Sequence, residues 1–212
     1  SHDDRAKKHN KLSYQRWMAD IIGLKQIGQI FVPLPDVSLE YARLFAEKYR
    51  LSGQKVVGLN VGSGPAWVTK RWPEANWLEL TQHLEGEAVL LLLGGREEEP
   101  AMKQLLSHSE TLLNGGWDNK LTDFFALLNL SDVVVTGDTL ALHAATGLKK
   151  KVVALFGPTS AAEIEDYGLV SKVITPLECY CCYRRECPDY PSCMAAIKPA
   201  TVARLVRRLL HE

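Results

Sequence analysis

An aspartate and a histidine stand where an apolar segment gives way to a helical pattern, in the stretch "DVVVTGDTLALHAATG" from residue 132 to 147. Asp138 or Thr139 can cap a helix that begins here, and His143 lies four positions after Thr139, on the same helix face. Because a helix N-terminus attracts anions, this corner could hold a phosphate group. A single histidine in an alanine-rich helix is more often a packed residue, so both interpretations stay open at this point.

The loop "GSGPAWVTKRWP" follows an earlier apolar segment and has the composition of a phosphate-binding loop. Gly62 and Ser63 offer backbone amides with little steric bulk, and Lys70, next to Thr69, can neutralise a phosphate. The loop matches neither the Walker pattern nor the dinucleotide fingerprint. The alternative is a flexible surface loop whose basic residues are solvated.

Two further loops combine glycine with polar side chains directly after an apolar segment. In "GGREEEP", Glu97 can accept two hydroxyl hydrogen bonds from a ribose, or can favour the positive end of the helix that follows. In "GPTSAAE", Thr159 or Ser160 stands at another helix start, as a cap or as a ligand. Four loops of this chemistry favour a binding site over four independent surface turns.

The elements that must position these loops alternate along the chain. Short apolar segments predict strands at 56–61, 88–93, 111–114, 132–136, 152–156 and 172–175. Amphipathic stretches between them predict helices at 73–84, 97–107, 120–130 and after residue 138. Near-continuous apolar strands separated by helices are typical of an α/β fold with a doubly wound parallel sheet, whose ligands bind at the carboxyl ends of the strands.

The first 54 residues differ from the rest of the chain. A helical spacing of apolar residues between Leu12 and Leu24 is followed by the extended connector "IFVPLPD" and by a helix for which Ser38 is the expected N-cap. We expect residues 1–54 to form a polar head, a helix and an interdomain linker, and residues 55–212 to form the ligand-binding domain.

Composition narrows the class of protein. The 212 residues hold 25 basic and 25 acidic side chains, so no overall field recruits nucleic acid. Hydrophobic residues make up 46% of the chain, enough for a sizeable core, and the longest apolar run is too short to cross a bilayer. All five cysteines fall within fifteen residues, which favours a reducing, cytoplasmic setting over a disulfide framework.

Four of these cysteines have a spacing compatible with a metal site. Cys179, Cys182, Cys187 and Cys193 occur in "CYCCYRRECPDYPSC", and four thiolates suit tetrahedral zinc or an iron-sulfur centre. The spacing is not that of two matched CxxC knuckles. Plain thiols that oxidise on purification are the alternative.

Residues 50 to 212 resemble, in order, the carboxyl-terminal domain of family 9 glycosyltransferases, the ADP-heptose:lipopolysaccharide heptosyltransferases. The resemblance lies in "VVGLNVGSGPAWVTKRWPEANW", "LLLLGGREEE", "ALLNLSDVVVTGDTLALHAATGLKKKVVALFGPTS" and "CYCCYRRECPDYPSCMAAIKP". It implies a two-domain GT-B fold, of which this chain holds the Rossmann-like, nucleotide-sugar half.

The resemblance also implies roles for individual residues. Gly62 and Ser63 match the phosphate-contacting loop, Lys70 the diphosphate lysine and Glu97 the acid that contacts the nucleoside. Asp138 matches an acid near the sugar. Thr139 and His143 match groups beside the diphosphate, with Leu140 between them in the donor site. Lys70 and His143 would stabilise the negative charge that develops on departing ADP.

The reaction implied is inverting transfer of heptose from ADP-heptose to the inner core of lipopolysaccharide, with no metal or other cofactor required. It would take place on the cytoplasmic face of the inner membrane of a Gram-negative-type bacterium, with peripheral membrane contact. The family's general base is an aspartate of the amino-terminal domain. No pattern of that domain precedes Lys55, so we expect this chain to bind donor without catalysing transfer alone.

Two departures from the family pattern keep other functions open. Leu140 stands where relatives usually have glycine, and "TGD" stands where "TND" is common. A non-catalytic nucleotide- or metal-binding module with a cysteine-rich loop is the main alternative. A GT-B nucleotide-sugar epimerase is another, although it would need both halves and a different set of acids.

Overall fold

The computed structural model describes residues 4–212, and the first three residues of the expected head lie outside that range. Six parallel strands form one sheet in the order β3-β2-β1-β4-β5-β6. All six expected strands are confirmed, with ends displaced by at most two residues. They are β1 Val56–Asn60, β2 Val89–Leu93, β3 Leu112–Asn114, β4 Val133–Gly137, β5 Lys151–Phe156 and β6 Val170–Ile174.

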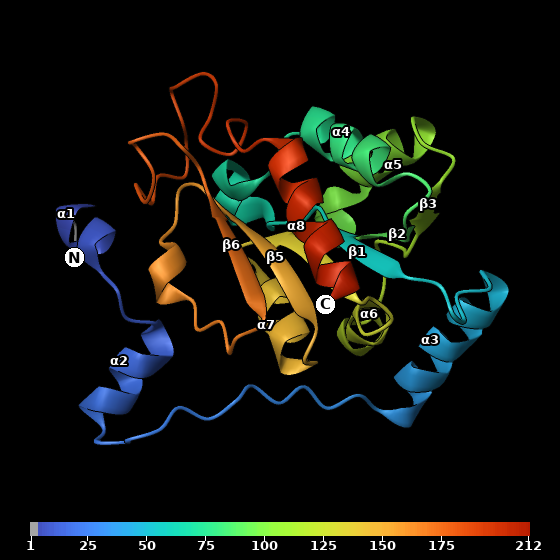
Figure 1. Ribbon diagram of the computed structural model, residues 1–212, viewed down its shortest axis with the longest axis horizontal. Coiled ribbons are helices and arrows are strands. Elements are labelled where there is room, and N and C mark those ends of the chain that lie inside the picture. The colour runs from blue at the N-terminus through green and yellow to red at the C-terminus, as the bar shows by residue number, and fades with distance from the viewer. Residues whose placement is uncertain (1–3) are drawn as a thin grey trace.

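Helices cover both faces of the sheet, as a doubly wound fold requires (Figure 1). Along β2 the side chains alternate: Leu90 and Leu92 pack in one buried cluster, Leu91 and Leu93 in the other. The first cluster includes α4 (Glu74–Leu84), α5 (Glu99–Ser107) and α8 (Pro199–His211). The second includes α3 (Asp36–Lys48), α6 (Leu121–Leu128) and α7 (Leu140–Gly147). Among these, α8 is a helix that the sequence patterns did not single out.

Helix α3 begins at Asp36, so the expectation that Ser38 is its N-cap is wrong. Pro35 takes the N-cap position, because its fixed φ suits an extended residue at a helix start. The Ser38 hydroxyl instead donates to Asp123 Oδ1 at 2.7 Å and ties α3 to α6. Helix α3 therefore packs on the sheet sandwich although it falls within residues 1–54.

The rest of the amino-terminal stretch lies along the outside of the sandwich (Figure 1). It contains the short helix α1 (Asp4–His9), then α2 (Tyr14–Ile21), which Ser13 caps by accepting from the Arg16 amide, and then an extended connector. The connector contacts the end of α7 closely, since a Cβ added at Gly147 would lie 2.6 Å from Cγ2 of Val32.

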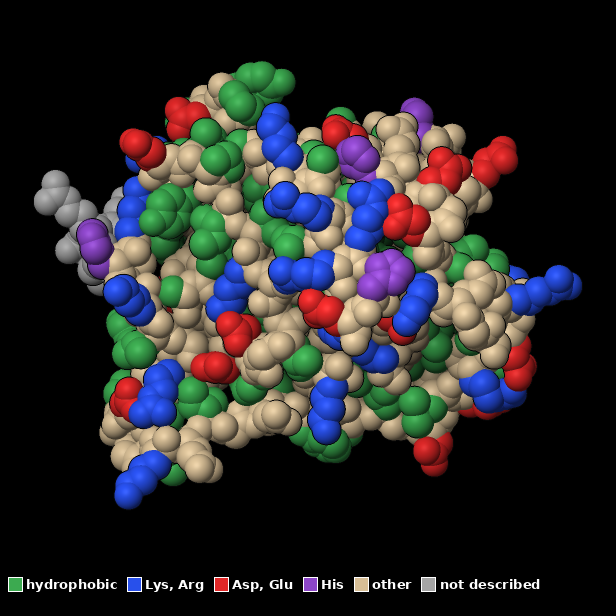
Figure 2. Space-filling model, in the orientation of Figure 1, with side chains coloured by type: hydrophobic (Ala, Val, Ile, Leu, Met, Phe, Trp, Pro, Cys, Tyr) green, Lys and Arg blue, Asp and Glu red, His purple; other side chains and the backbone are tan. Residues whose placement is uncertain are grey.

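In the described part of the chain, no helix has the length and apolar character needed to cross a membrane. Acidic and basic side chains are interspersed on the face shown in Figure 2, in keeping with equal numbers of the two in the sequence. Three 3-10 turns complete the fold at the carboxyl ends of strands: η1 (Pro65–Lys70), η2 (Arg96–Glu98) and η3 (Ala161–Glu163).

Candidate functional site

A cavity of about 410 Å³ lies at the carboxyl ends of β1, β2 and β4. The sheet order reverses between β1 and β4, which is the position where doubly wound sheets bind ligands. The walls combine three glycine-containing loops with apolar residues of α6 and α7. They are formed by Asn60, Gly62, Ser63, Gly64, Gly94, Gly95, Glu98, Asn119, Leu121, Phe124, Thr139, Leu140 and Ala141.

The floor of the cavity is a small buried hydrogen-bond network. The side-chain amide of Asn60, at the end of β1, donates to Thr136 Oγ1 at 3.0 Å and lies 3.4 Å from Thr139 Oγ1. The two threonine hydroxyls are 2.9 Å apart. Thr139 also caps α7 by accepting from the Ala141 amide at 3.2 Å, which confirms it as the N-cap. The network fixes β1 and β4 to the start of α7.

Glu98 is the carboxylate that organises the two glycine loops. It is only 7% exposed, and its two oxygens accept from the amides of Gly64 at 3.3 Å and Gly95 at 3.0 Å. Gly64 has a φ of 70°, a conformation that glycine adopts without strain. Glu98 thus joins the loop after β1 to the loop after β2 and forms part of the cavity wall.

Gly62 leaves no room for a side chain beside Glu98. A Cβ at Gly62 would lie 2.9 Å from Cδ of Glu98, whose carboxylate is held by two amides. We expect Gly62→Ala to lower the free energy of unfolding by about 1–3 kcal/mol, because Glu98 must move and lose amide partners. Chemical denaturation checks this. Gly28→Ala, at a glycine with open space around it, should leave stability nearly unchanged, and equal effects of the two substitutions would contradict the prediction.

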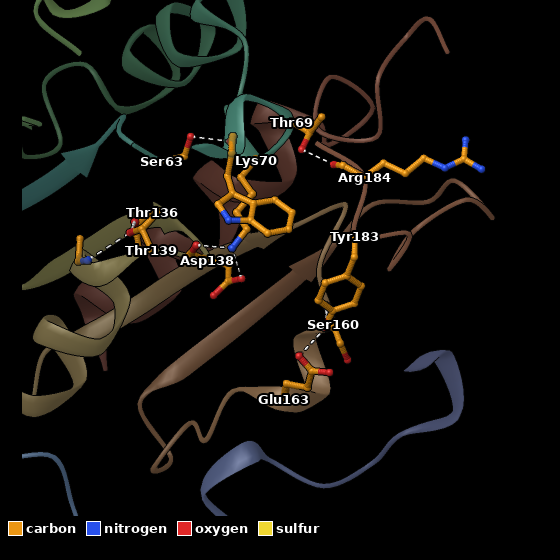
Figure 3. Close-up of polar contacts among 12 residues, drawn as sticks. Ser63, Thr69, Lys70, Thr136, Asp138, Thr139, Ser160, Glu163, Tyr183 and Arg184 are labelled. Atoms are coloured by element: carbon orange, nitrogen blue, oxygen red, sulfur yellow. Dashed lines mark hydrogen bonds and ion pairs between the residues drawn. The ribbon is translucent and has the colours of Figure 1, made fainter. Parts of the chain in front are cut away.

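Lys70 and Asp138 form an ion pair beside the cavity (Figure 3). The Lys70 ammonium donates to Asp138 Oδ2 at 2.7 Å and to the Asp138 carbonyl at 3.2 Å. Their side chains are only 14% and 16% exposed. An ammonium has three N–H donors, so one remains for a bound anion. The geometry presents a fixed positive charge at the rim, partly neutralised by its own carboxylate.

The structure separates the other residues predicted for the donor site. Leu140 is 56% exposed and lines the cavity at the first turn of α7. His143 is half-buried on α7 and is not among the residues that line this cavity. Glu97 is exposed and lines a neighbouring cavity with Arg71 and Glu74. The structure therefore brings Glu98, rather than Glu97, together with the predicted loops.

Sequence reasoning missed Glu98, Asn60 and Thr136 as parts of this site. A polar residue ending the apolar run "VVGLN" was a usable signal for Asn60. The three consecutive glutamates offered none for Glu98, because only the 3-10 turn η2 decides which of them points inward.

A second, smaller cavity of about 140 Å³ is lined by Cys179, Cys182, Cys187 and Cys193. All five cysteines are free thiols, and Cys181 is buried outside this lining. Burial, together with the neighbouring thiols of the cavity, raises the pKa of Cys193 to about 11. Within residues 4–212, no three His, Cys, Asp or Glu side chains are arranged to hold a metal ion. The four predicted cysteines are thus brought together around one cavity without forming a ligand shell.

A model of the family described as "Glycosyltransferase family 9 (heptosyltransferase)" matches residues 32–191. The match covers all four rim loops and most of the cysteine segment. The chain belongs to glycosyltransferase family 9. Lipooligosaccharide heptosyltransferase 2 of Campylobacter jejuni is 24% identical to this family 9 chain, in an alignment that covers 95% of the chain. The chain spans 65% of that relative's length, just under two thirds.

Solved glycosyltransferase structures share the fold. The Escherichia coli ADP-heptose lipopolysaccharide heptosyltransferase II matches this family 9 chain with a TM-score of 0.68 at 21% identity, covering 88% of the chain and 55% of that protein. The iron-containing dodecameric glycosyltransferase TibC of enterotoxigenic E. coli matches with a TM-score of 0.59 at 14% identity, covering 90% and 52%. The six-stranded parallel sheet is thus that of GT-B heptosyltransferase structures.

Proposed function

We propose that this chain is the donor-binding half of an inverting heptosyltransferase, and that it binds ADP-heptose for transfer to the inner core of lipopolysaccharide. The observation that carries the proposal is the cavity at the β1–β4 switch point, with the Lys70–Asp138 ion pair beside it. Family membership and the ADP-heptose named for the E. coli relative support the choice of donor.

The cavity suits the parts of a nucleotide sugar. Leu121 and Phe124 offer an apolar wall for a base, and Glu98 offers a carboxylate for ribose hydroxyls. The backbone of Gly62 and Ser63 and the N-terminus of α7 can contact the diphosphate. Lys70 would stabilise the negative charge that builds on ADP as it leaves. His143, which lies on α7, is proposed to assist Lys70 in this role.

The proposed site is tested by calorimetric titration of the 212-residue chain with ADP and ADP-heptose. We expect micromolar binding of both ADP and ADP-heptose. If the chain binds neither of them, the alternative of a non-catalytic module is favoured. A transferase assay with ADP-heptose and acceptor should show no turnover by this chain, because the proposed general base lies outside it. Turnover would contradict that part of the proposal.

We propose that the whole protein transfers heptose at the cytoplasmic face of the inner membrane.

We further propose that the four cysteines of the smaller cavity bind a structural metal, zinc or iron. Four thiols around 140 Å³ have the donor chemistry for either, and the TibC relative is described as iron-containing. The thiols would have to move inward to ligate, and no step of sugar transfer is assigned to the metal.

Metal analysis of protein purified under reducing conditions tests this second proposal. About one metal ion per chain is expected, together with a lower midpoint of thermal unfolding after chelation. Cys182→Ser should lose the metal, whereas Cys181→Ser, which alters a thiol outside the cavity lining, should keep it. Metal-free protein whose unfolding is insensitive to chelator supports plain thiols instead.

A further inference from the structure

The segment Cys181–Arg185, which we call the strap, connects two loops of the rim. On one side, the backbone amides of Cys181 and Tyr183 donate to the carbonyls of Gly157 and Pro158 at 2.9 and 2.8 Å. On the other side, the Arg184 carbonyl accepts from Thr69 Oγ1 at 2.8 Å (Figure 3). The strap therefore bridges the loop after β5 and the turn that carries Lys70.

Tyr183 anchors the strap firmly. Its hydroxyl accepts from the Ser160 amide at 3.1 Å and donates to Glu163 Oε2 at 2.5 Å. Burial and the hydrogen bond to Glu163 raise the pKa of Tyr183, so the phenol keeps its proton. Cys181 and Tyr183 have φ values of 62° and 53°, a backbone conformation that persists only where surrounding contacts enforce it. This strained anchor holds the strap in one position.

The strap reaches Lys70 through Trp67. The Arg185 guanidinium lies 5.7 Å from the centre of the Trp67 ring, and Lys70 Nζ lies 4.9 Å from the same centre. An aromatic ring attracts cations within about 6 Å of its centre. Since Lys70 also donates twice to Asp138, the indole and the aspartate together define where the ammonium sits. Trp67 has a non-helical φ of −132°, which marks a kink within η1.

We infer that Trp67, whose ring the Arg185 guanidinium of the strap approaches, is a positioning residue that keeps the Lys70 ammonium aligned for a diphosphate. The inference rests on the proposed ADP-sugar site and adds residues to it that no other observation assigns. Two cations close to one ring repel each other, and a diphosphate offers both of them a counter-ion. In this arrangement the cysteine segment contributes the strap to the donor site.

Calorimetric titration with ADP and with AMP separates positioning from general structure. Trp67→Leu should weaken ADP binding by about three- to tenfold, because the cation–π attraction on Lys70 is lost. AMP binding should be unchanged, because AMP lacks the second phosphate. Trp67→Phe keeps an aromatic face and should restore most of the ADP affinity. In a Lys70→Met background, Trp67→Leu should have no further effect on ADP.

A comparison of neighbouring arginines completes the test. Arg185→Gln should weaken ADP more than Arg184→Gln, which removes the same charge but keeps the carbonyl contact to Thr69. Equal losses for ADP and AMP, or additive effects of Trp67→Leu and Lys70→Met, would overturn the positioning role while leaving the donor site in place. Failure of the unmodified chain to bind either nucleotide overturns the proposed function and this inference with it.

Discussion

Replacement of Lys70 by methionine is expected to weaken ADP binding by about ten- to a hundredfold. Hydrogen bonds to charged groups contribute about 1.5–3 kcal/mol, and each 1.4 kcal/mol corresponds to about a factor of ten in affinity. Methionine retains the length and apolar stem of lysine, so the change removes mainly the charge. Titration with ADP and AMP measures the effect, and AMP affinity should fall much less.

Replacement of Asp138, the ion-pair partner of Lys70, is expected to have the opposite effect on ADP binding. Its carboxylate occupies one Lys70 donor at 2.7 Å, so Asp138 competes with a diphosphate for the ammonium. We expect Asp138→Asn to strengthen ADP binding severalfold, whereas Lys70→Met weakens it. Lys103→Met, which removes an exposed lysine paired with Glu99 on α5, controls for the change in net charge and should leave both affinities near their starting values. Weakening of ADP binding by both Lys70→Met and Asp138→Asn would contradict this competition and would show that Asp138 mainly holds the ammonium in place.

The sheet could be predicted from the sequence because its strands are buried on both faces. Runs such as "VVGLN", "VLLLL" and "VVVT" are apolar at successive positions, a pattern that a half-exposed strand does not have. The rim loops could be predicted for a related reason, since glycine and hydroxyl residues directly after such runs must lie at the carboxyl edge of a parallel sheet. Gly62, Ser63, Thr139 and Leu140 accordingly meet at one cavity.

Sequence reasoning was less successful where tertiary contacts decide. Ser38 has the residue type of an N-cap, but the proline at position 35 starts the helix earlier and frees the hydroxyl for Asp123. The connection of Thr69 to the cysteine segment joins residues 115 positions apart, and no local pattern encodes it. The cysteine spacing predicted four neighbouring thiols without revealing that the same segment reaches Lys70 through Trp67.

The second large effect is expected from replacement of Glu98, the buried member of three consecutive glutamates. Glu98→Ala should weaken ADP and AMP alike by about tenfold or more, and should lower the free energy of unfolding by about 2–4 kcal/mol. Two part-buried amides, of Gly64 and Gly95, lose a charged acceptor, and a hydrogen bond to a charged group contributes about 1.5–3 kcal/mol. Both glycine loops would then be free to move, which removes part of the wall of the nucleotide cavity. Titration and chemical denaturation measure the two consequences separately.

Glu97→Ala is the matched control, because it removes the same side chain from an exposed position one residue earlier. It should change the free energy of unfolding by less than about 0.5 kcal/mol, as is usual for exposed substitutions. If Glu97 is the acid that contacts the nucleoside, as the family pattern implied, Glu97→Ala will lower nucleotide affinity without affecting stability. Glu98→Gln distinguishes further, since one amide oxygen can still serve one glycine loop while the NH₂ group cannot serve the other. If Glu98→Gln has an intermediate affinity for nucleotide and Glu97→Ala has an unchanged one, the buried carboxylate of Glu98 forms the wall that contacts the nucleoside.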